Sequence, residues 1–190
     1  MFYASRNLGI LDGLNPVART RFAALLDRLD AAGENVLLTD GGRTAWRQNA
    51  LYEQGRTRPG AIVTDARGDE SFHVWKVAVD LVPVTPDGKL RYDDTAAYER
   101  IALIANGLGI QWGFALWGVD RPHFQYTQGL TIADFRAGRR LVEEFGPEPL
   151  PLIVSAAVRL RGLVRRLRGT PDPARRDFIQ RLIDRISRRS

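Results

Sequence analysis

The sequence predicts an α+β domain with a small, mainly antiparallel sheet flanked by helices. Helix-like and strand-like segments are mixed along the chain without the regular β-α-β alternation that would indicate a parallel sheet. A length of 190 residues is sufficient for one domain with a sizeable core and a short appendage. Hydrophobic residues make up 44% and charged residues 26% of the chain, which is ordinary for a globular protein.

The first third of the chain predicts a helix, a strand and a second helix. The pair Asn15-Pro16 is typical of a helix N-terminus, and apolar residues then recur at helical spacing up to Gly33. The apolar run 36–39 predicts a short buried strand that ends at a glycine-containing turn. A second helix is expected over residues 44–55, where a glycine stops it.

The remaining elements of the domain are shorter. Several charges and glycines make residues 56–70 a loop, and the apolar spacing over residues 94–108 predicts a third helix. We expect strands over residues 77–82, 110–114 and 123–126, and a short helix near 131–145 that closes the domain.

The chain is expected to divide into a domain over residues 1–145, a linker and a tail. The segment 146–151 contains three prolines, which resist helix and sheet alike. Residues 152–190 combine arginines with apolar side chains at helical spacing, which predicts an Arg-rich amphipathic helical tail. The basic character belongs to the tail, because 11 of the 28 basic residues but only 3 of the 22 acidic residues follow residue 150.

A basic amphipathic helix suits an anionic surface. We therefore expect the tail to bind either an anionic membrane or a polymer of the cell wall. The alternative is a helical hairpin that packs against the domain. No nucleic-acid partner is expected, because the tail has no aromatic platform for bases and no recognised nucleic-acid-binding motif.

Two absences narrow the chemistry and the expected location. The chain has no cysteine, which excludes disulfides, thiolate metal sites and cysteine nucleophiles. Its first residues lack the charged start and the apolar core of a signal peptide, and no apolar run reaches the roughly 18 residues of a membrane span. We expect the protein to be cytoplasmic as synthesised.

The chain contains only two histidines, and each has an aspartate nearby. His73 precedes Asp80 by seven residues at the start of an apolar run, and His123 follows Asp120 by three. Two imidazoles and one carboxylate are a typical ligand set for catalytic zinc, and the remaining carboxylate would act as the base. The residue types leave open which aspartate has which role, and each pair taken alone could be an ordinary polar contact.

The surroundings of the first histidine resemble a known enzyme motif. Ser71-x-His73-x-x-Lys76-x-Ala78-x-Asp80 resembles the SxHxxGxAxD motif of the LAS group of zinc peptidases. Within this group the likeness is to the D-alanyl-D-alanine carboxypeptidase and L-alanyl-D-glutamate endopeptidase family, which includes many phage endolysins. The resemblance implies the hedgehog/DD-peptidase-like form of the α+β fold.

Two further segments resemble the same family. Asp120-x-x-His123-Phe124 resembles its second motif, in which an acidic residue stands three positions before the last zinc ligand. A stretch around Arg43 resembles the segment that follows the first core strand and supplies a substrate-binding arginine. The resemblance covers about residues 10–130 of the chain.

The resemblance implies a role for each of five residues. His73, Asp80 and His123 would bind one zinc ion, and Asp120 would be the general base. Arg43 would face the substrate and stabilise a carboxylate or the developing oxyanion, a role that suits its fixed charge and planar donors. The alternative for Arg43 is a surface salt bridge.

Four other side chains are candidates for contact with the substrate. Gln48 and Ser71 match positions of the family's motifs, but an amide on a helix and a hydroxyl in a loop could equally hold the backbone of the site. Trp117 is expected to line the cleft, as Trp112 could, although a tryptophan near a strand end is often part of the core.

Lys76 stands where the motif has glycine. Glycine tolerates a positive φ, whereas lysine in a left-handed conformation costs about 1 kcal/mol or more. All four chemical positions are intact, so we interpret Lys76 as a change in loop shape or substrate fit. The alternative is an inactive relative of the family.

The resemblance implies a zinc metallopeptidase that hydrolyses peptidoglycan stem peptides. We expect a phage-type lysis enzyme that cleaves between L-Ala and D-Glu, leaves the cytoplasm through a separate membrane pore and acts on the cell wall after release. The motifs also fit a D-Ala-D-Ala carboxypeptidase. A non-catalytic, metal-containing wall-binding module is a further alternative, against which Asp120 argues, because binding alone needs no base.

Overall fold

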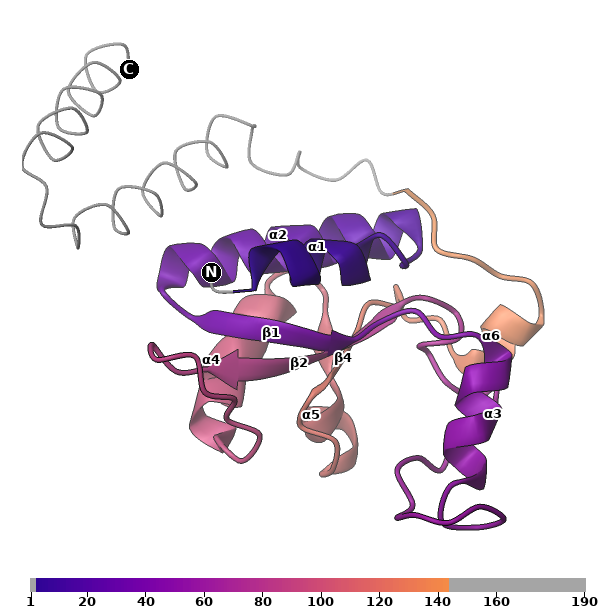
Figure 1. Cartoon of the computed structure of the whole chain (residues 1–190). Coiled ribbons are helices and arrows are strands. Elements are labelled where there is room, and N and C mark those ends of the chain that lie inside the picture. Colours follow the sequence, from indigo (N-terminus) through magenta and orange to yellow (C-terminus); the bar gives the residue numbers. More distant parts are fainter. Residues whose placement is uncertain (1–2, 144–190) are drawn as a thin grey trace, which may run out of the picture. The chain divides into compact units, whose positions relative to one another are not determined.

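A four-stranded sheet lies at the centre of the domain (Figure 1). The computed structural model describes residues 3–143 of the chain. The strand order is β1-β2-β4-β3, with β1 at Asn35–Asp40, β2 at Ala78–Val84, β3 at Gln111–Trp112 and β4 at His123–Gln125. Every neighbouring pair is antiparallel, which confirms the predicted α+β class.

The chain divides into two compact units, Met1–Phe145 and Gly146–Ser190. All described residues belong to the first unit. Outside the described residues lie the predicted linker at 146–151 and the predicted amphipathic tail at 152–190. The expected binding of the tail to an anionic membrane or wall polymer therefore stays a prediction. Within residues 3–143, no helix combines the length and the apolar character that crossing a bilayer requires.

Three of the predicted helices are present near their expected bounds. They are α2 (Pro16–Ala32), α3 (Ala45–Glu53) and α4 (Thr95–Asn106). Each begins after a side chain that accepts a hydrogen bond from a backbone N–H of the first turn, which satisfies a donor that the helix itself leaves free. These capping residues are Asn15, Thr44 and Asp94.

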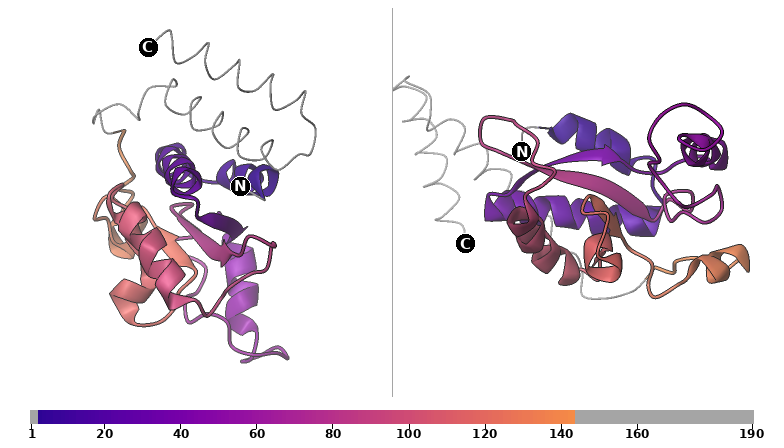
Figure 2. Two further views of the ribbon diagram at one scale, coloured as in Figure 1. Left: turned by 90° about the vertical axis from the view of Figure 1, so that its left-hand side faces the viewer. Right: turned by 90° about the horizontal axis from the view of Figure 1, so that it is seen from below.

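The core lies on one face of the sheet, where α2 and α4 pack against each other and against the strands. Alternate residues of a strand point to opposite faces, so Val79 and Leu81 of β2 enter this core while Asp80 points away from it. Phe22 of α2 and Tyr98 of α4 are fully buried in the same cluster. Figure 2 shows that α3 and the loop after it stand apart from these two helices.

The short helix α1 (Ala4–Leu11) was not predicted, and one of its side chains protects the edge of the sheet. Strand β1 is an edge strand, which leaves backbone groups without a strand partner. The buried amide of Asn7 replaces that partner: it donates to the carbonyl of Val36 (3.1 Å) and accepts from the N–H of Leu38 (2.9 Å).

Two other local predictions were wrong. The expected strand 110–114 is interrupted after Trp112, because α5 (Gly113–Trp117) begins there and ends at Gly118 with a φ of 71°. The expected helix 131–145 is only α6 (Ile132–Arg136), which starts with a capping box and is followed by Gly138 with a φ of 89°. In both places a glycine in a left-handed conformation stops the helix.

Lys76 adopts the left-handed conformation that the family motif assigns to glycine. Its φ is 61°, and its N–H donates to the carbonyl of His73 (3.0 Å). Its own carbonyl accepts from the N–H of Asn15 (2.8 Å), at the start of α2. The strained residue therefore closes the turn between His73 and β2 and ties that turn to α2.

We predict that Lys76→Gly stabilises the protein and that Lys76→Ala does not. Both variants remove the lysine side chain, but only glycine removes the Cβ that makes a left-handed conformation costly. The glycine variant should exceed the alanine variant by about 1 kcal/mol in free energy of unfolding, measured by urea denaturation. Equal stability of the two variants would show that the turn stores no such strain.

Candidate metal centre

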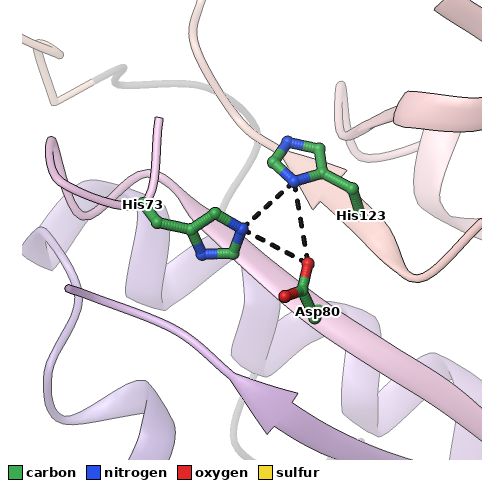
Figure 3. A group of neighbouring side chains, drawn as sticks. All are labelled: His73, Asp80 and His123. Carbon is green, nitrogen blue, oxygen red and sulfur yellow. Dashed lines mark hydrogen bonds and ion pairs between the residues drawn. The ribbon is translucent and has the colours of Figure 1, made fainter. Parts of the chain in front are cut away.

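The pairing of β2 with β4 brings Asp80 and His123 together. The two residues are direct partners in the antiparallel register, and both point away from the core described above. His73 reaches the same place from the turn that precedes β2 (Figure 3). Nε2 of His73 lies 3.3 Å from Oδ1 of Asp80 and 3.1 Å from Nδ1 of His123, and Nδ1 of His123 lies 3.7 Å from Oδ1 of Asp80.

The hydrogen bond of His73 to the backbone fixes which of its nitrogens can bind a metal. Nδ1 of His73 lies 2.8 Å from the carbonyl oxygen of Gly41, which can only accept. Nδ1 therefore carries the proton, and in the neutral ring Nε2 presents a lone pair to Asp80 and His123. A backbone carbonyl on the outer nitrogen is a common arrangement for histidines that bind metals.

The three inward atoms form a donor set for one cation. They are Nε2 of His73, Nδ1 of His123 and a carboxylate oxygen of Asp80, all within 4.8 Å of one another. Two lone pairs only 3.1 Å apart, next to a carboxylate oxygen, repel one another unless a cation or a proton lies between them. Nitrogen and carboxylate ligands of this kind fit zinc, so the residues present suit the predicted metal.

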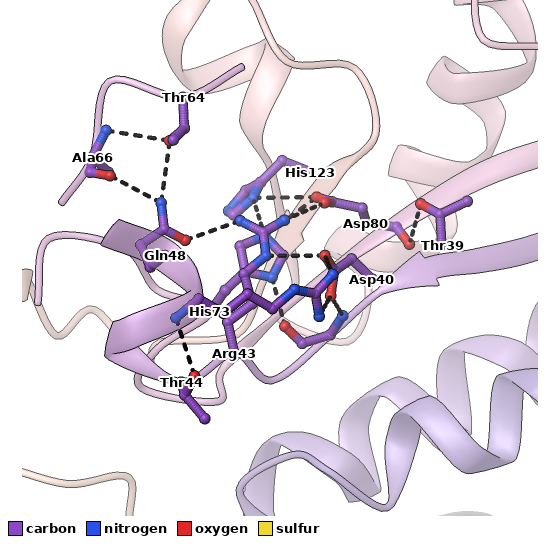
Figure 4. A network of polar contacts seen from close by, with 12 residues as sticks. Thr39, Asp40, Arg43, Thr44, Gln48, Thr64, Ala66, His73, Asp80 and His123 are labelled. Atoms are coloured by element: carbon purple, nitrogen blue, oxygen red, sulfur yellow. Dashed lines mark hydrogen bonds and ion pairs between the residues drawn. The ribbon is translucent and has the colours of Figure 1, made fainter. Parts of the chain in front are cut away.

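The second oxygen of Asp80 holds Arg43 in the site (Figure 4). Nη2 of Arg43 lies 3.0 Å from Oδ2 of Asp80, and its Nε lies 3.0 Å from Oδ2 of Asp40. Asp40 also accepts a hydrogen bond from the N–H of Gly41, whose carbonyl orients His73. Arg43 thus bridges two carboxylates, and the loop after β1 contacts the candidate metal ligands at two points, through Arg43 to Asp80 and through Gly41 to His73.

The charges around Asp80 keep it ionised. Burial alone would raise the pKa of Asp80, but when the two imidazoles are protonated, their hydrogen bonds and charges outweigh burial and hold the pKa of Asp80 well below its ordinary value. An ionised carboxylate is the form that binds a metal.

Gln48 is buried completely and supports Arg43. Its Oε1 accepts from Nη1 of Arg43 (3.1 Å), and its Nε2 donates to Thr64 (3.3 Å) and to the carbonyl of Ala66 (2.9 Å). The side chain therefore joins α3, Arg43 and the loop 56–70. This burial favours the structural alternative for Gln48 over direct contact with substrate.

The structure separates the two tryptophans. Trp112 is buried and stacked between core rings, and its Nε1 donates to the carbonyl of Arg121 (2.7 Å), so it belongs to the core. Trp117 is half-exposed, with its ring centroid 5.3 Å from that of His123, so it lies beside the donor set, and its contact with substrate stays a prediction. Ser71 is buried two residues before His73, and its carbonyl accepts from the N–H of Val74.

Asp120 is an exposed residue next to the donor set, not a member of it. It has a φ of 64°, and its carbonyl accepts from the N–H of His123 (3.3 Å). Partial desolvation raises the pKa of Asp120, and the Asp80 charge adds to this effect while His123 opposes it. A carboxylate with a raised pKa near the donor set has the properties of a general base.

Several residues of the site were not predicted. Asp40 orients Arg43, and Gly41 orients His73. Oε1 of Gln125 lies 3.1 Å from Nε2 of His123, and Gly113 packs against His123 and Trp117. One signal was present in the sequence: His123 and Gln125 stand two positions apart in a predicted strand, so they share a face.

A family and a curated relative match this chain. The family described as D-alanyl-D-alanine carboxypeptidase matches residues 64–126. The peptidoglycan L-alanyl-D-glutamate endopeptidase CwlK of Bacillus subtilis is 32% identical over 132 residues, which cover 64% of this chain and 78% of that protein.

Solved structures of peptidoglycan peptidases are also similar. The L-Ala D-Glu endopeptidase ChiX of Serratia marcescens is 23% identical with a TM-score of 0.47, and the match covers 69% of this chain and 90% of that one. A variant of the vancomycin-resistance D,D-pentapeptidase VanY in complex with Zn(II) is 15% identical with a TM-score of 0.46, over 65% and 83% of the two chains.

We predict that Gly113→Ala disturbs the site. A Cβ on Gly113 would lie 3.0 Å from Cβ of His123 and 2.9 Å from Cζ3 of Trp117, closer than side-chain atoms normally approach. The variant should lose about 1–3 kcal/mol of unfolding free energy, as overpacked cores do, and should bind zinc more weakly in chelator competition.

Gly9→Ala is the matched control for this prediction. It makes the same substitution in helix α1, where the added Cβ meets nothing within 4 Å, so it should gain about 0.5–1 kcal/mol. If Gly113→Ala equals the wild type in stability and in zinc affinity, Gly113 does not define the position of His123.

Proposed function

Because the chain belongs to the LAS-type family of D-alanyl-D-alanine carboxypeptidases and L-alanyl-D-glutamate endopeptidases, we propose that it is a zinc enzyme that cleaves the L-Ala–D-Glu bond of peptidoglycan stem peptides. The chain is a metallopeptidase by this membership. One observation carries the proposal for the metal: His73, Asp80 and His123 direct three donor atoms at one point.

Each residue of the site has a role in the proposed reaction. His73, Asp80 and His123 would hold the ion, which when bound lowers the pKa of water to about 7 and polarises the scissile carbonyl. Asp120 accepts the proton of the attacking water and passes it to the departing amine, and its raised pKa brings its basicity nearer to neutral pH.

Arg43 supplies fixed positive charge beside the reacting carbonyl. Three of its five N–H donors make the contacts with Asp40, Gln48 and Asp80, and two remain for a substrate oxygen. Because these contacts hold the guanidinium in place, little reorganisation is needed when charge develops. Trp117, half-exposed beside His123, offers an apolar wall to the peptide.

The proposal for which bond is cleaved rests on CwlK, the relative that is 32% identical. CwlK carries the name of an L-alanyl-D-glutamate endopeptidase, and this chain covers 78% of it. The description of the matching family supports a second candidate, trimming of terminal D-Ala by a D,D-carboxypeptidase. The phage-type role in lysis and the passage from the cytoplasm to the wall stay predictions.

Purified muropeptides separate the two bonds. Incubation of the zinc-loaded protein with disaccharide pentapeptide should leave L-Ala on the sugar and release a peptide that begins with D-Glu, both identified by mass. Loss of a single terminal D-Ala would instead support the carboxypeptidase. No product from a protein that contains zinc would contradict both and support a non-catalytic module.

We predict that variants of the zinc ligands lose zinc and that a variant of the base keeps zinc but loses activity. His73→Ala and Asp80→Ala remove a donor atom and should abolish stoichiometric zinc binding, measured by elemental analysis after dialysis. Asp120→Ala should keep the zinc and lose about 10²- to 10⁴-fold in kcat, the usual contribution of a general base. Equal loss of zinc in all three variants would contradict this division of roles.

A further inference from the structure

A row of buried, hydrogen-bonded polar side chains continues from His123 away from the donor set. Gln125 follows His123 on the same face of β4, and both side chains are buried, with exposed fractions of 4% and 5%. Nε2 of His123 lies 3.1 Å from Oε1 of Gln125. The amide nitrogen of Gln125 donates to Oε1 of Gln111 (3.2 Å), its partner in the β3–β4 register, and the hydroxyl of Thr127 donates to the same oxygen (3.4 Å).

The direction of hydrogen bonding along this row of side chains decides which nitrogen of His123 carries the lone pair. A neutral imidazole has one N–H, and an amide oxygen next to Nε2 requires the proton there. The lone pair then lies on Nδ1, the atom that faces His73 and Asp80 (Figure 3). If the amide of Gln125 were reversed, its NH₂ group would need an acceptor at Nε2, and the proton would move to Nδ1 and block the donor set.

Gln111 in turn holds the amide of Gln125 in the required direction. Its Oε1 accepts from both Gln125 and Thr127, so the NH₂ group of Gln125 is drawn toward Gln111 and its oxygen toward His123. The same task is done for His73 by the carbonyl of Gly41, which cannot reverse. Within residues 3–143, the ring nitrogens of His123 have only side-chain partners, so its tautomer depends on residues that can be replaced.

We propose that Gln125 is a positioning residue that fixes the tautomer and ring orientation of His123 for metal binding through Nδ1, and that Gln111 sets the direction of Gln125. The inference rests on the proposed metal site. Partners on the outer nitrogen of a ligating histidine typically contribute roughly 10- to 100-fold to metal affinity.

Zinc affinity of the purified protein, measured by chelator competition, tests the proposal. Gln125→Leu removes the acceptor and keeps similar volume, and it should bind zinc roughly 10- to 100-fold more weakly. Gln125→Glu keeps an acceptor oxygen and should stay within threefold of the wild type or bind more tightly. Gln54→Leu, the same substitution in the loop after α3, is the matched control and should leave the affinity unchanged.

Variants of Gln111 test whether Gln111 sets the direction of Gln125. Gln111→Leu leaves the amide of Gln125 free to reverse and should weaken zinc binding by less than Gln125→Leu does. Gln111→Glu offers only acceptor oxygens to Gln125 and should preserve the affinity. Equal loss in the leucine and glutamate variants at either position would mean that packing, and not the direction of hydrogen bonding, is what matters, and would overturn the proposal.

Nitrogen-15 NMR gives a readout that does not depend on activity. The chain has two histidines, so the imidazole spectrum contains four nitrogen signals, and the zinc-loaded wild type should show His73 bound through Nε2 and His123 through Nδ1. Gln125→Leu should speed the solvent exchange of the Nε2 proton of His123 and leave the Nδ1 proton of His73 unchanged.

The possible failures are distinguishable. Metal binding by His123 through Nε2, or an unchanged affinity of Gln125→Leu, overturns only the role of Gln125. Absence of zinc binding in the wild type overturns the proposed function itself. Thermal unfolding of the metal-free proteins identifies a variant that fails to fold, and the glutamate variants then carry the comparison.

Discussion

The antiparallel register that places Asp80 opposite His123 is the constraint on which the rest of the site depends. A shift of one residue would turn every side chain of β2 to the other face, so Asp80 would enter the core and Val79 would leave it. The buried apolar residues that flank Asp80 therefore hold a candidate metal ligand in place from the opposite face of the strand. Stability of the core and geometry of the site are the same property here.

The donor set is organised by contacts outside it. Oδ1 of Asp80 faces the two histidines and Oδ2 faces Arg43, so the single carboxylate joins the candidate metal ligands to the residue proposed to bind substrate. Removing charges from water is costly unless each has a partner, and Asp40 and Gln48 supply such partners to Arg43. These contacts restrict the positions of Arg43 and Asp80, and fixed donors of this kind reduce the reorganisation that a reaction requires.

Most elements could be predicted, because helix caps and apolar periodicity are local signals. Asn15 before Pro16, and Asp94, mark helices that the structure contains. The helix α1 was missed because what anchors it is the pair of hydrogen bonds from Asn7 to a strand about thirty residues away in the sequence. The helix α5 was missed because its apolar sequence also suits a strand. The motif marked position 76 as one where glycine is usual, and the structure gives the reason, because Lys76 has a φ of 61°.

The sequence by itself determined the chemistry available to this protein: two histidines, no cysteine, and aspartates at spacings that match a peptidase family. Only the tertiary structure decided which atoms meet. It turned Oδ1 of Asp80 toward the histidines and Oδ2 toward Arg43, placed Nε2 of His123 beside Gln125, and buried Gln48 behind Arg43. The physical reason is that strand pairing and hydrogen-bond direction join residues far apart in the chain, and no local pattern records which nitrogen of a ring or which oxygen of a carboxylate will face its partner.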